Sequence, residues 1–249
     1  MAGHSHWARI KRAKSVADAR RGREWSRLSR AIIVAARNGG GDPDANLPLR
    51  YAIEAARDAN MPKETIERAI KKGTGELGGA ALEELFFEGY GPGGAAVMVS
   101  ALTDNRNRTA PEIKKIFELH GGNLGATNCV AWMFTKRGVF LIARDKTDED
   151  TLTTLALESG ADDVQVQGEG YELTCDPAVF NTVRSALAQA GIKPDSAEIT
   201  MVASTNVTLA GEEAERMMKL IDALEEHDDV NNVYSNFELS AADAARLSS

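Results

Sequence analysis

The first 75 residues have the spacing of apolar side chains that helices require. From Trp25 onward, apolar residues recur at intervals of three and four positions, so they fall on one face of a helix: Trp25, Leu28, Ile32 and Ala36. Arginines fall on the opposite side of the same helix: Arg20, Arg23, Arg27, Arg30 and Arg37. Two further helices are predicted, one starting near Asn46 and one over residues 62–73. We therefore expect an all-helical first domain.

Beyond residue 84 the pattern changes to short apolar strands that alternate with amphipathic helices. A glycine-rich stretch at residues 73–84 separates the two regions and is typical of a hinge. Residues 135–201 carry the order strand, helix, strand, strand, helix, strand, which is typical of a ferredoxin-like unit. Predicted strands before this unit include residues 128–134. The pieces after it include a strand at 206–209, and we expect them to complete the sheet begun before it.

The predicted fold class is therefore α+β. An N-terminal helical domain is followed by two ferredoxin-like α/β domains, the last one inserted into the middle one. The predicted domains are a basic helical domain over residues 1–75, a discontinuous α/β domain over residues 80–134 plus 202–240, and an inserted ferredoxin-like domain over residues 135–201.

The charge is divided unevenly between these regions. Residues 1–75 contain 16 Lys and Arg against 8 Asp and Glu, whereas the rest of the chain contains 13 against 29, and the whole carries a net charge of −8. The acidic remainder repels polyanions, so a phosphate-rich partner must be met by the N-terminal part. The alternative is a charge asymmetry that serves solubility alone.

The beginning of the chain is a basic arm. Over residues 5–20 the cations point around the whole circumference of a helix, so we expect a partner rather than a core to order this segment. Lys and Arg neutralise phosphates, and Trp7 with its neighbouring histidines offers flat surfaces for stacking on bases. The candidate nucleic-acid-binding residues here are His4, His6, Trp7, Arg9, Lys11, Arg12, Lys14, Arg20, Arg21, Arg23, Arg27 and Arg30. A merely solvated helix is the alternative, and no base-reading motif decides between DNA and RNA.

The stretch "TDNRNRTAPE" (residues 103–112) is a second candidate site. Thr109 and Glu112 have the spacing of a capping box, which predicts a helix with Pro111 in its first turn. Arg106 and Arg108 then stand just before the helix N-terminus, where an anion is favoured. We expect them to bind a phosphate of the nucleic acid or a carboxylate, and a capped turn with surface arginines is the alternative.

Enzyme, cofactor and membrane interpretations find little support. "GYGPGG" (residues 89–94) matches the dinucleotide-binding pattern, but it contains Pro92 and precedes a strand, so it predicts a turn. His120 and His227 have the positions of ordinary residues at helix ends. The two cysteines lack metal-ligand spacing, and no apolar run approaches the ~20 residues of a membrane span. We expect a cytoplasmic protein without cofactor, metal or small-molecule substrate.

A weak Cu(II) or Ni(II) site at Ala2-Gly3-His4, formed after removal of Met1, is a separate hypothesis.

Three motifs in this order, "AGHSHWARIK", "EGYGPGG" and "TDNRNRTAPEIKKIF", give the chain a resemblance to the YebC/PmpR family. That resemblance implies a helical domain followed by two α/β domains in a cytoplasmic protein without cofactor. His6 stands where the family pattern usually has Lys, which would make one phosphate contact depend on pH. Family members are described as probable transcriptional regulatory proteins, and the mitochondrial relatives as translational activators.

From these observations we expect a non-enzymatic nucleic-acid-binding regulator of gene expression, namely a DNA-binding transcriptional regulator. The alternative is a translation factor that docks on ribosomal RNA and associates with the ribosome. A third hypothesis is a scaffold whose acidic domains bind other proteins.

Overall fold

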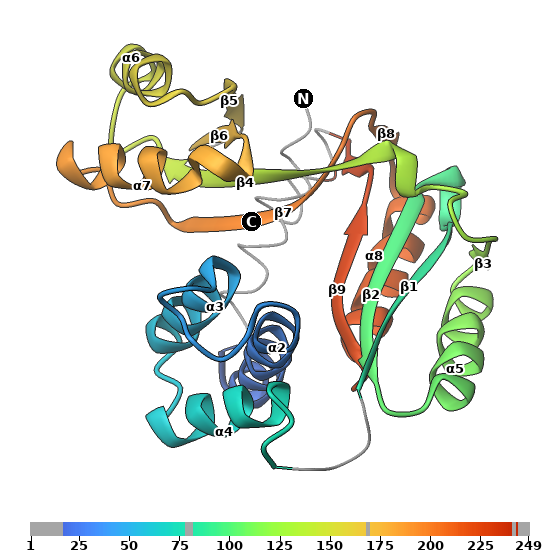
Figure 1. Ribbon diagram of the computed structural model, residues 1–249. Coiled ribbons are helices and arrows are strands. Elements are labelled where there is room, and N and C mark those ends of the chain that lie inside the picture. Colours follow the sequence, from blue (N-terminus) through green and yellow to red (C-terminus); the bar gives the residue numbers. More distant parts are fainter. Residues whose placement is uncertain (1–16, 78–81, 168–169, 241–242, 244–249) are drawn as a thin grey trace.

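The computed structural model describes residues 17–77, 82–167, 170–240 and 243, which form a helical part and two four-stranded sheets (Figure 1). Residues 1–16, which hold most of the predicted arm, lie outside the described residues, as does the Cu(II) or Ni(II) hypothesis. Among the described residues, no helix is long and apolar enough to cross a membrane.

The helical part consists of three helices around one apolar core: α2 (Ala17–Gly39), α3 (Leu47–Asp58) and α4 (Lys63–Gly73). Asn46 joins the end of α2 to the start of α3. Its side-chain oxygen accepts a hydrogen bond from the backbone N–H of Leu49 at 3.2 Å, and its amide group donates to the carbonyls of Ala35 at 2.7 Å and Gly40 at 2.8 Å. One side chain thus caps α3 and holds the last turn of α2. The predicted helices are confirmed.

The first sheet has four antiparallel strands in the order β3-β1-β2-β9. The strands are β1 (Glu83–Tyr90), β2 (Ala96–Thr103), β3 (Asn123–Leu124) and β9 (Val230–Ser235). Two helices, α5 (Arg106–Leu119) and α8 (Gly211–Glu225), cover one face of this sheet. Phe117, Met217 and Leu220 are fully buried in the resulting core. Burial of this apolar face holds two segments that are distant in sequence, residues 83–124 and 211–235, in one layer of strands and one layer of helices.

The predicted turn at residues 89–94 joins β1 to β2 and is confirmed. Gly93 has a φ of 67°, in the left-handed region that favours glycine. A Cβ atom at Gly91 would lie 2.5 Å from the sulfur of Met217, so a side chain at this position would force Met217 of α8 to shift. The glycines of this stretch therefore serve packing and turn geometry.

One strand was assigned wrongly from the sequence. Strand β8 (Val207–Leu209) pairs in parallel with β10 (Phe237–Leu239) in a separate two-stranded sheet, so residues 206–209 do not complete the first sheet. Asn236 is the reason. Its side chain accepts a hydrogen bond from Ala96 N at 2.7 Å, and its carbonyl accepts one from Val207 N at 2.8 Å, so the chain leaves β9 and runs beside β8.

The second sheet contains β4 (Phe134–Ala143), β5 (Asp163–Gln167), β6 (Gly170–Cys175) and β7 (Ser196–Ala203), with helices α6 (Glu149–Ser159) and α7 (Phe180–Gln189). Its strand order is β5-β6-β4-β7, all antiparallel, which is the order of a ferredoxin-like unit. The predicted mixed class, a helical region followed by sheet-containing domains, is confirmed. The first sheet is also covered by helices, but its connectivity differs from that of the second sheet. Its first two strands, β1 and β2, are joined directly as a hairpin, with no helix between them.

We propose that the predicted units 1–75, 80–134 plus 202–240, and 135–201 are the domains of the chain. Each of the three main apolar clusters draws its fully buried members largely from one unit, and each four-stranded sheet draws its strands from one unit apart from a residue or two at the junctions. Each unit therefore has a core of its own, and the chain passes between the second and third units at β4 and β7.

Residues 128–134 were predicted to be a strand, and this is wrong for all but Phe134, where β4 begins. They form a turn and a 3-10 helix (Ala131–Met133). The cause is Glu88 of β1, whose buried carboxylate accepts hydrogen bonds from the backbone N–H groups of Asn128 at 2.7 Å, Val130 at 2.9 Å and Ala131 at 2.7 Å. Burial raises the pKa of Glu88, but these three bonds outweigh it, and the pKa lies below its usual value.

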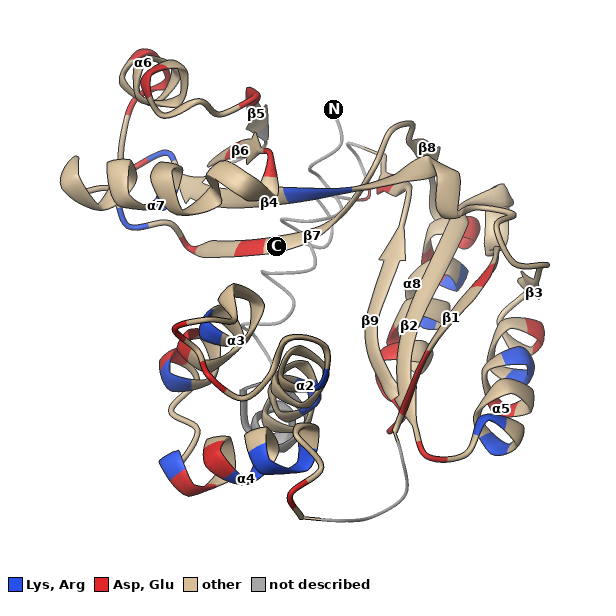
Figure 2. Ribbon diagram, in the orientation of Figure 1, with Lys and Arg blue, Asp and Glu red and all other residues tan. Residues whose placement is uncertain are grey.

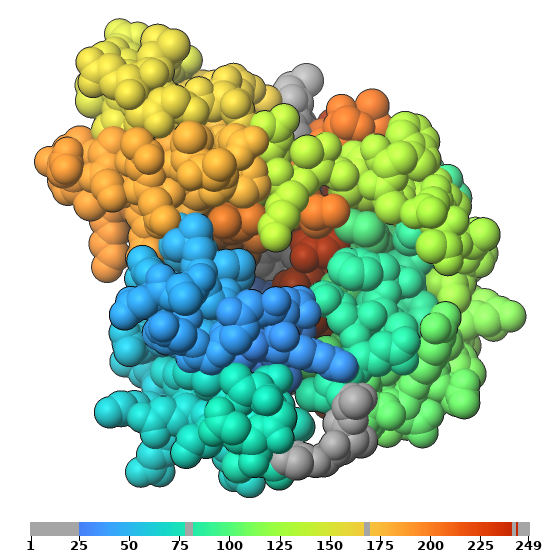
Figure 3. All heavy atoms as spheres, in the orientation of Figure 1, coloured from blue at the N-terminus to red at the C-terminus, as the bar shows by residue number. Residues whose placement is uncertain are grey.

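The helical part contacts both sheet domains. Leu102 of β2 belongs to its apolar cluster, and the ring of Tyr51 meets Phe180 of α7 edge-on with centroids 5.4 Å apart. Arg184 of α7 forms an ion pair with Glu54 of α3. The surface is hollowed where the three parts meet (Figure 3).

Replacing Glu88 tests the turn that it organises. Glu88→Gln leaves three backbone N–H groups, one of them buried and two partly buried, facing an amide in place of a carboxylate. We therefore expect it to lower the free energy of unfolding by about 1–3 kcal/mol at pH 7. Because the folded pKa lies below the unfolded one, the stabilisation by Glu88 is present above the unfolded pKa and is lost as pH falls through the folded pKa. Urea unfolding at pH 7 and in acid measures both effects. Glu84→Gln, an exposed position on the same strand, is the control, and equal losses in the two variants would contradict the assignment.

Candidate nucleic-acid interface

The structure describes only part of the predicted cationic surface. Arg20, Arg21 and Arg23 lie in the first turns of α2, and Arg27 follows with an exposed side chain. The remaining candidates of the arm lie outside the described residues: His4, His6, Trp7, Arg9, Lys11, Arg12 and Lys14.

Arg30 faces the first sheet domain, contrary to its predicted place on an exposed cationic face. Its guanidinium donates hydrogen bonds to the carbonyls of Asp228 and Val230, the latter at 2.9 Å. Burial lowers the pKa of Arg30, and the nearby carboxylates of Asp228 and Asp229 only partly offset it. Helical periodicity places this side chain opposite the core correctly, but it cannot show that another domain lies there.

The helix after "TDNRNRT" begins earlier than its capping-box pattern predicted. Asn105 is the N-cap of α5 and accepts a hydrogen bond from the backbone N–H of Arg108 at 3.2 Å, so Pro111 lies inside the helix. Thr109 does not cap. Its hydroxyl lies 2.8 Å from the hydroxyl of Thr103 and donates to the carboxylate of Asp229 at 2.6 Å.

The predicted anion position at this helix end is taken by a carboxylate of the chain itself. Arg108 pairs with Asp229 at 2.8 Å and with Asp104 at 3.2 Å, and its pKa is raised mainly by the hydrogen bond to Asp229. Burial raises the pKa of Asp229, but the bonds from Arg108 and Thr109 outweigh it and lower the pKa. Arg106 lies 3.7 Å from Glu83. Of the two ligands expected for Arg108, the geometry favours the carboxylate.

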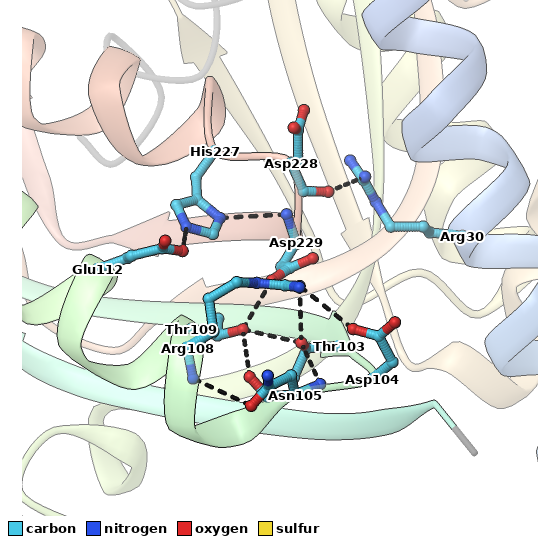
Figure 4. Close-up of polar contacts among 10 residues, drawn as sticks. All are labelled: Arg30, Thr103, Asp104, Asn105, Arg108, Thr109, Glu112, His227, Asp228 and Asp229. Atoms are coloured by element: carbon cyan, nitrogen blue, oxygen red, sulfur yellow. Dashed lines mark hydrogen bonds and ion pairs between the residues drawn. The ribbon is translucent and has the colours of Figure 1, made fainter. Parts of the chain in front are cut away.

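His227 extends this network from the turn between α8 and β9 (Figure 4). Its Nδ1 accepts a hydrogen bond from the backbone N–H of Asp229 at 3.1 Å, so in the neutral ring Nε2 carries the proton and donates to Glu112 at 3.0 Å. Together with Arg30 on the carbonyl of Asp228, the contacts connect α2, the start of α5 and the α8–β9 turn. The network therefore sets the position of the cationic helix against the first sheet.

Glu112, His227 and Asp229 also present ligand atoms within 4.8 Å of one another, which raises the question of a metal ion. The residues do not fit one. The carboxylate of Asp229 already forms an ion pair with the guanidinium of Arg108. A neutral His227 that bound a metal through Nε2 would carry its proton on Nδ1. Nδ1, however, accepts a hydrogen bond from the backbone N–H of Asp229 and so has no proton.

Neither cysteine is arranged as a nucleophile. Burial raises the pKa of the Cys175 thiol to about 11 and also raises the pKa of Cys129, so neither carries thiolate character near neutral pH.

Sequence reasoning missed Asp229 and the junction role of Arg30. The only signal for Asp229 is the acidic turn "EEHDDV" after a helix, which by itself is typical of a solvated surface. Its partner Arg108 lies 121 positions away, so local spacing could not have paired them.

Comparison with known proteins places the chain in a family. The family described as "TACO1/YebC protein N-terminal domain" matches residues 5–76, and "TACO1/YebC second and third domain" matches residues 82–237. A relative from Pelotomaculum thermopropionicum, named "Probable transcriptional regulatory protein", is 56% identical and covers 96% of this chain and 99% of its own. One from Geobacter sulfurreducens with the same designation is 51% identical over 99% of this chain and 100% of its own.

Among solved structures, the crystal structure of a conserved hypothetical protein from Aquifex aeolicus is similar, with a TM-score of 0.80 and 47% identity. The match covers 90% of this chain and 92% of that one. The resemblance noted from three motifs thus extends over nearly the whole sequence and over the fold. The chain belongs to the TACO1/YebC family.

Proposed function

We propose that this protein is a non-enzymatic, nucleic-acid-binding regulator of gene expression, acting in the cytoplasm as a DNA-binding transcriptional regulator. The observation that carries the proposal is the division of charge, with a net +8 on residues 1–75 and a net −16 on the remainder. A polyanion is attracted by the first part and repelled by the second. The names of the relatives, probable transcriptional regulatory proteins, support a regulatory role.

In this proposal the contacts to phosphate come from the arm and the exposed side of α2. Lys and Arg there neutralise phosphates and release counterions, while Trp7, with His4 and His6 beside it, stacks on an unpaired base. The proposed contact residues are His4, His6, Trp7, Arg9, Lys11, Arg12, Lys14, Arg20, Arg21, Arg23 and Arg27.

Arg30, Arg106 and Arg108 have a different part in the proposal. Arg30 and Arg108 already have close partners at the domain junction, so displacing those partners would offset much of the gain from a phosphate contact. Arg106 has only an exposed ion pair with Glu83 at 3.7 Å, which contributes little to stability. We assign Arg30 and Arg108 to holding the cationic helix in place, and Arg106 to an exposed ion pair. The acidic sheet domains orient the basic part.

A ribosome-associated RNA-binding translation factor is the second candidate. The observation that favours it is the all-round charge of residues 5–20 without a base-reading motif, which suits the phosphates of structured RNA.

Charge reversal in the arm tests the proposal. In the full chain, Lys11→Glu/Arg12→Glu/Lys14→Glu is expected to weaken binding to duplex DNA and to flatten the slope of log K against log salt by about 0.9 for each phosphate that is no longer neutralised. Fluorescence anisotropy over a salt series measures both quantities, with a structured RNA hairpin as the second probe.

The matched control is Lys115→Glu/Lys193→Glu/Lys219→Glu, which makes the same change in net charge at exposed positions of the acidic domains. Equal losses in the two triple variants would count against a phosphate role for the arm. Tighter binding to RNA, together with cosedimentation with ribosomes that the arm variant loses, would favour the translation factor.

A matched pair of alanine variants separates contact from positioning. Arg27→Ala is expected to reduce nucleic-acid affinity and the salt slope while the thermal unfolding temperature stays unchanged. Arg30→Ala removes the donor from two carbonyls at the domain junction, so we expect a loss of about 1–3 kcal/mol in unfolding free energy and a larger radius of gyration in X-ray scattering. If Arg30→Ala left both stability and dimensions unchanged, the junction role would be wrong.

A further inference from the structure

The Lys and Arg side chains of the helical part fall into two groups. Within residues 25–77, Arg30 binds carbonyls, Arg50 lies 3.7 Å from Asp44, and Lys63 lies 3.7 Å from Glu67. The others are exposed and make no ion pair or hydrogen bond with another described residue: Arg27, Arg37, Arg57, Arg68, Lys71 and Lys72. Four of these six fall in α4 or in the last turn of α2.

Three of them share one face of α4. Lys71 and Lys72 lie three and four positions after Arg68, so each is a neighbour of Arg68 on the helix surface. This face lies opposite the buried residues Ile66 and Ala69. Figure 2 shows the last turn of α4 in the colour of Lys and Arg.

A glycine allows the helix end that carries Arg37 to approach the end of α4. A Cβ atom at Gly73 would lie 2.6 Å from the carbonyl oxygen of Ile33 and 2.7 Å from Cβ of Ala36, so the end of α4 packs directly on the backbone of α2. Arg37 follows Ala36, and Lys72 precedes Gly73. Positive side chains from two helix ends therefore flank one close contact.

Compensation of the helix dipole explains only part of this arrangement. A cation in the last turn of a helix is favourable, which suits Arg37, Lys71 and Lys72 individually. Like charges at spacings of three and four repel each other, however, and Arg68 lies before the last turn. Glu64 is one turn away from Arg68, yet no ion pair joins them among the described residues. Among the described residues, no ion pair joins Arg68, Lys71 or Lys72 to a carboxylate, although Glu64 and Glu67 lie on the same helix.

We propose that Arg37, Arg68, Lys71 and Lys72 form a second phosphate-binding surface, the α4 surface, for the backbone of the nucleic acid bound by the arm. This inference rests on the proposed function and extends it from the arm and α2 to the far end of the helical domain. Four exposed cations on long stems neutralise successive phosphates without reading bases. The α4 surface adds affinity and sets the direction in which the strand leaves the arm.

The test compares Lys71→Glu/Lys72→Glu with a matched double variant, Lys115→Glu/Lys219→Glu, in the full chain. We expect the first to weaken binding to a 20-base-pair DNA duplex and to an RNA hairpin about tenfold or more at low salt, and to flatten the salt slope on the duplex by about 0.9 for each phosphate released. The control should change affinity less than twofold. The relative loss on the two probes shows whether the surface serves DNA or RNA.

Three results overturn or separate the claims. Equal affinities and slopes for the α4 variant and its control would remove the α4 surface while leaving the arm proposal intact. Self-association of the unaltered protein in sedimentation that the α4 variant loses, with unchanged nucleic-acid binding, would assign the surface to a second, acidic copy of this chain instead. If the unaltered protein bound neither the DNA duplex nor the RNA hairpin, the proposed function itself would be wrong. Lys71→Gln/Lys72→Gln, expected to have half the effect, replaces the charge reversal if that variant does not fold.

Discussion

The arrangement of the cationic helix depends on the hydrogen bonds that the half-buried carboxylate of Asp229 accepts. This carboxylate accepts hydrogen bonds from Arg108 at 2.8 Å and Thr109 at 2.6 Å, and so ties the α8–β9 turn to the start of α5. The carbonyls on either side of it, from Asp228 and Val230, receive Arg30 of α2. A buried charge is stable only when it is paired and hydrogen-bonded, so the turn, the helix start and α2 constrain one another.

This constraint separates two kinds of cation in the protein. Arg30 and Arg108 have partners within the chain: Arg30 donates hydrogen bonds to two carbonyls, and Arg108 pairs with carboxylates at the junction. Six exposed cations of the helical part make no ion pair or hydrogen bond with another described residue, and they remain available to an external anion: Arg27, Arg37, Arg57, Arg68, Lys71 and Lys72. Nucleic-acid binding in our proposal therefore depends on side chains that the fold leaves uncompensated, while the paired ones keep the surface oriented.

Much of the architecture was predictable because it follows local rules. Apolar residues spaced for one helix face and a cap at Asn46 predicted the helical part, and the alternation of strands and helices over residues 135–201 predicted the ferredoxin-like order. The failures occurred where a distant residue overrides local preference. Glu88 bends an apolar stretch into a turn, and Asn236 directs β10 to β8. In both cases one polar side chain supplies a backbone partner that the local sequence does not reveal.

The sequence alone determined the helical first domain, the order of elements in the inserted unit and the division of charge, because periodicity and composition depend on near neighbours. Only the tertiary structure decided which arginines are paired. The partners of Arg108 and Arg30 lie 121 and about 200 positions away along the chain. Such pairs form when folding brings distant backbone and side chains together, and no spacing within the sequence encodes that distance.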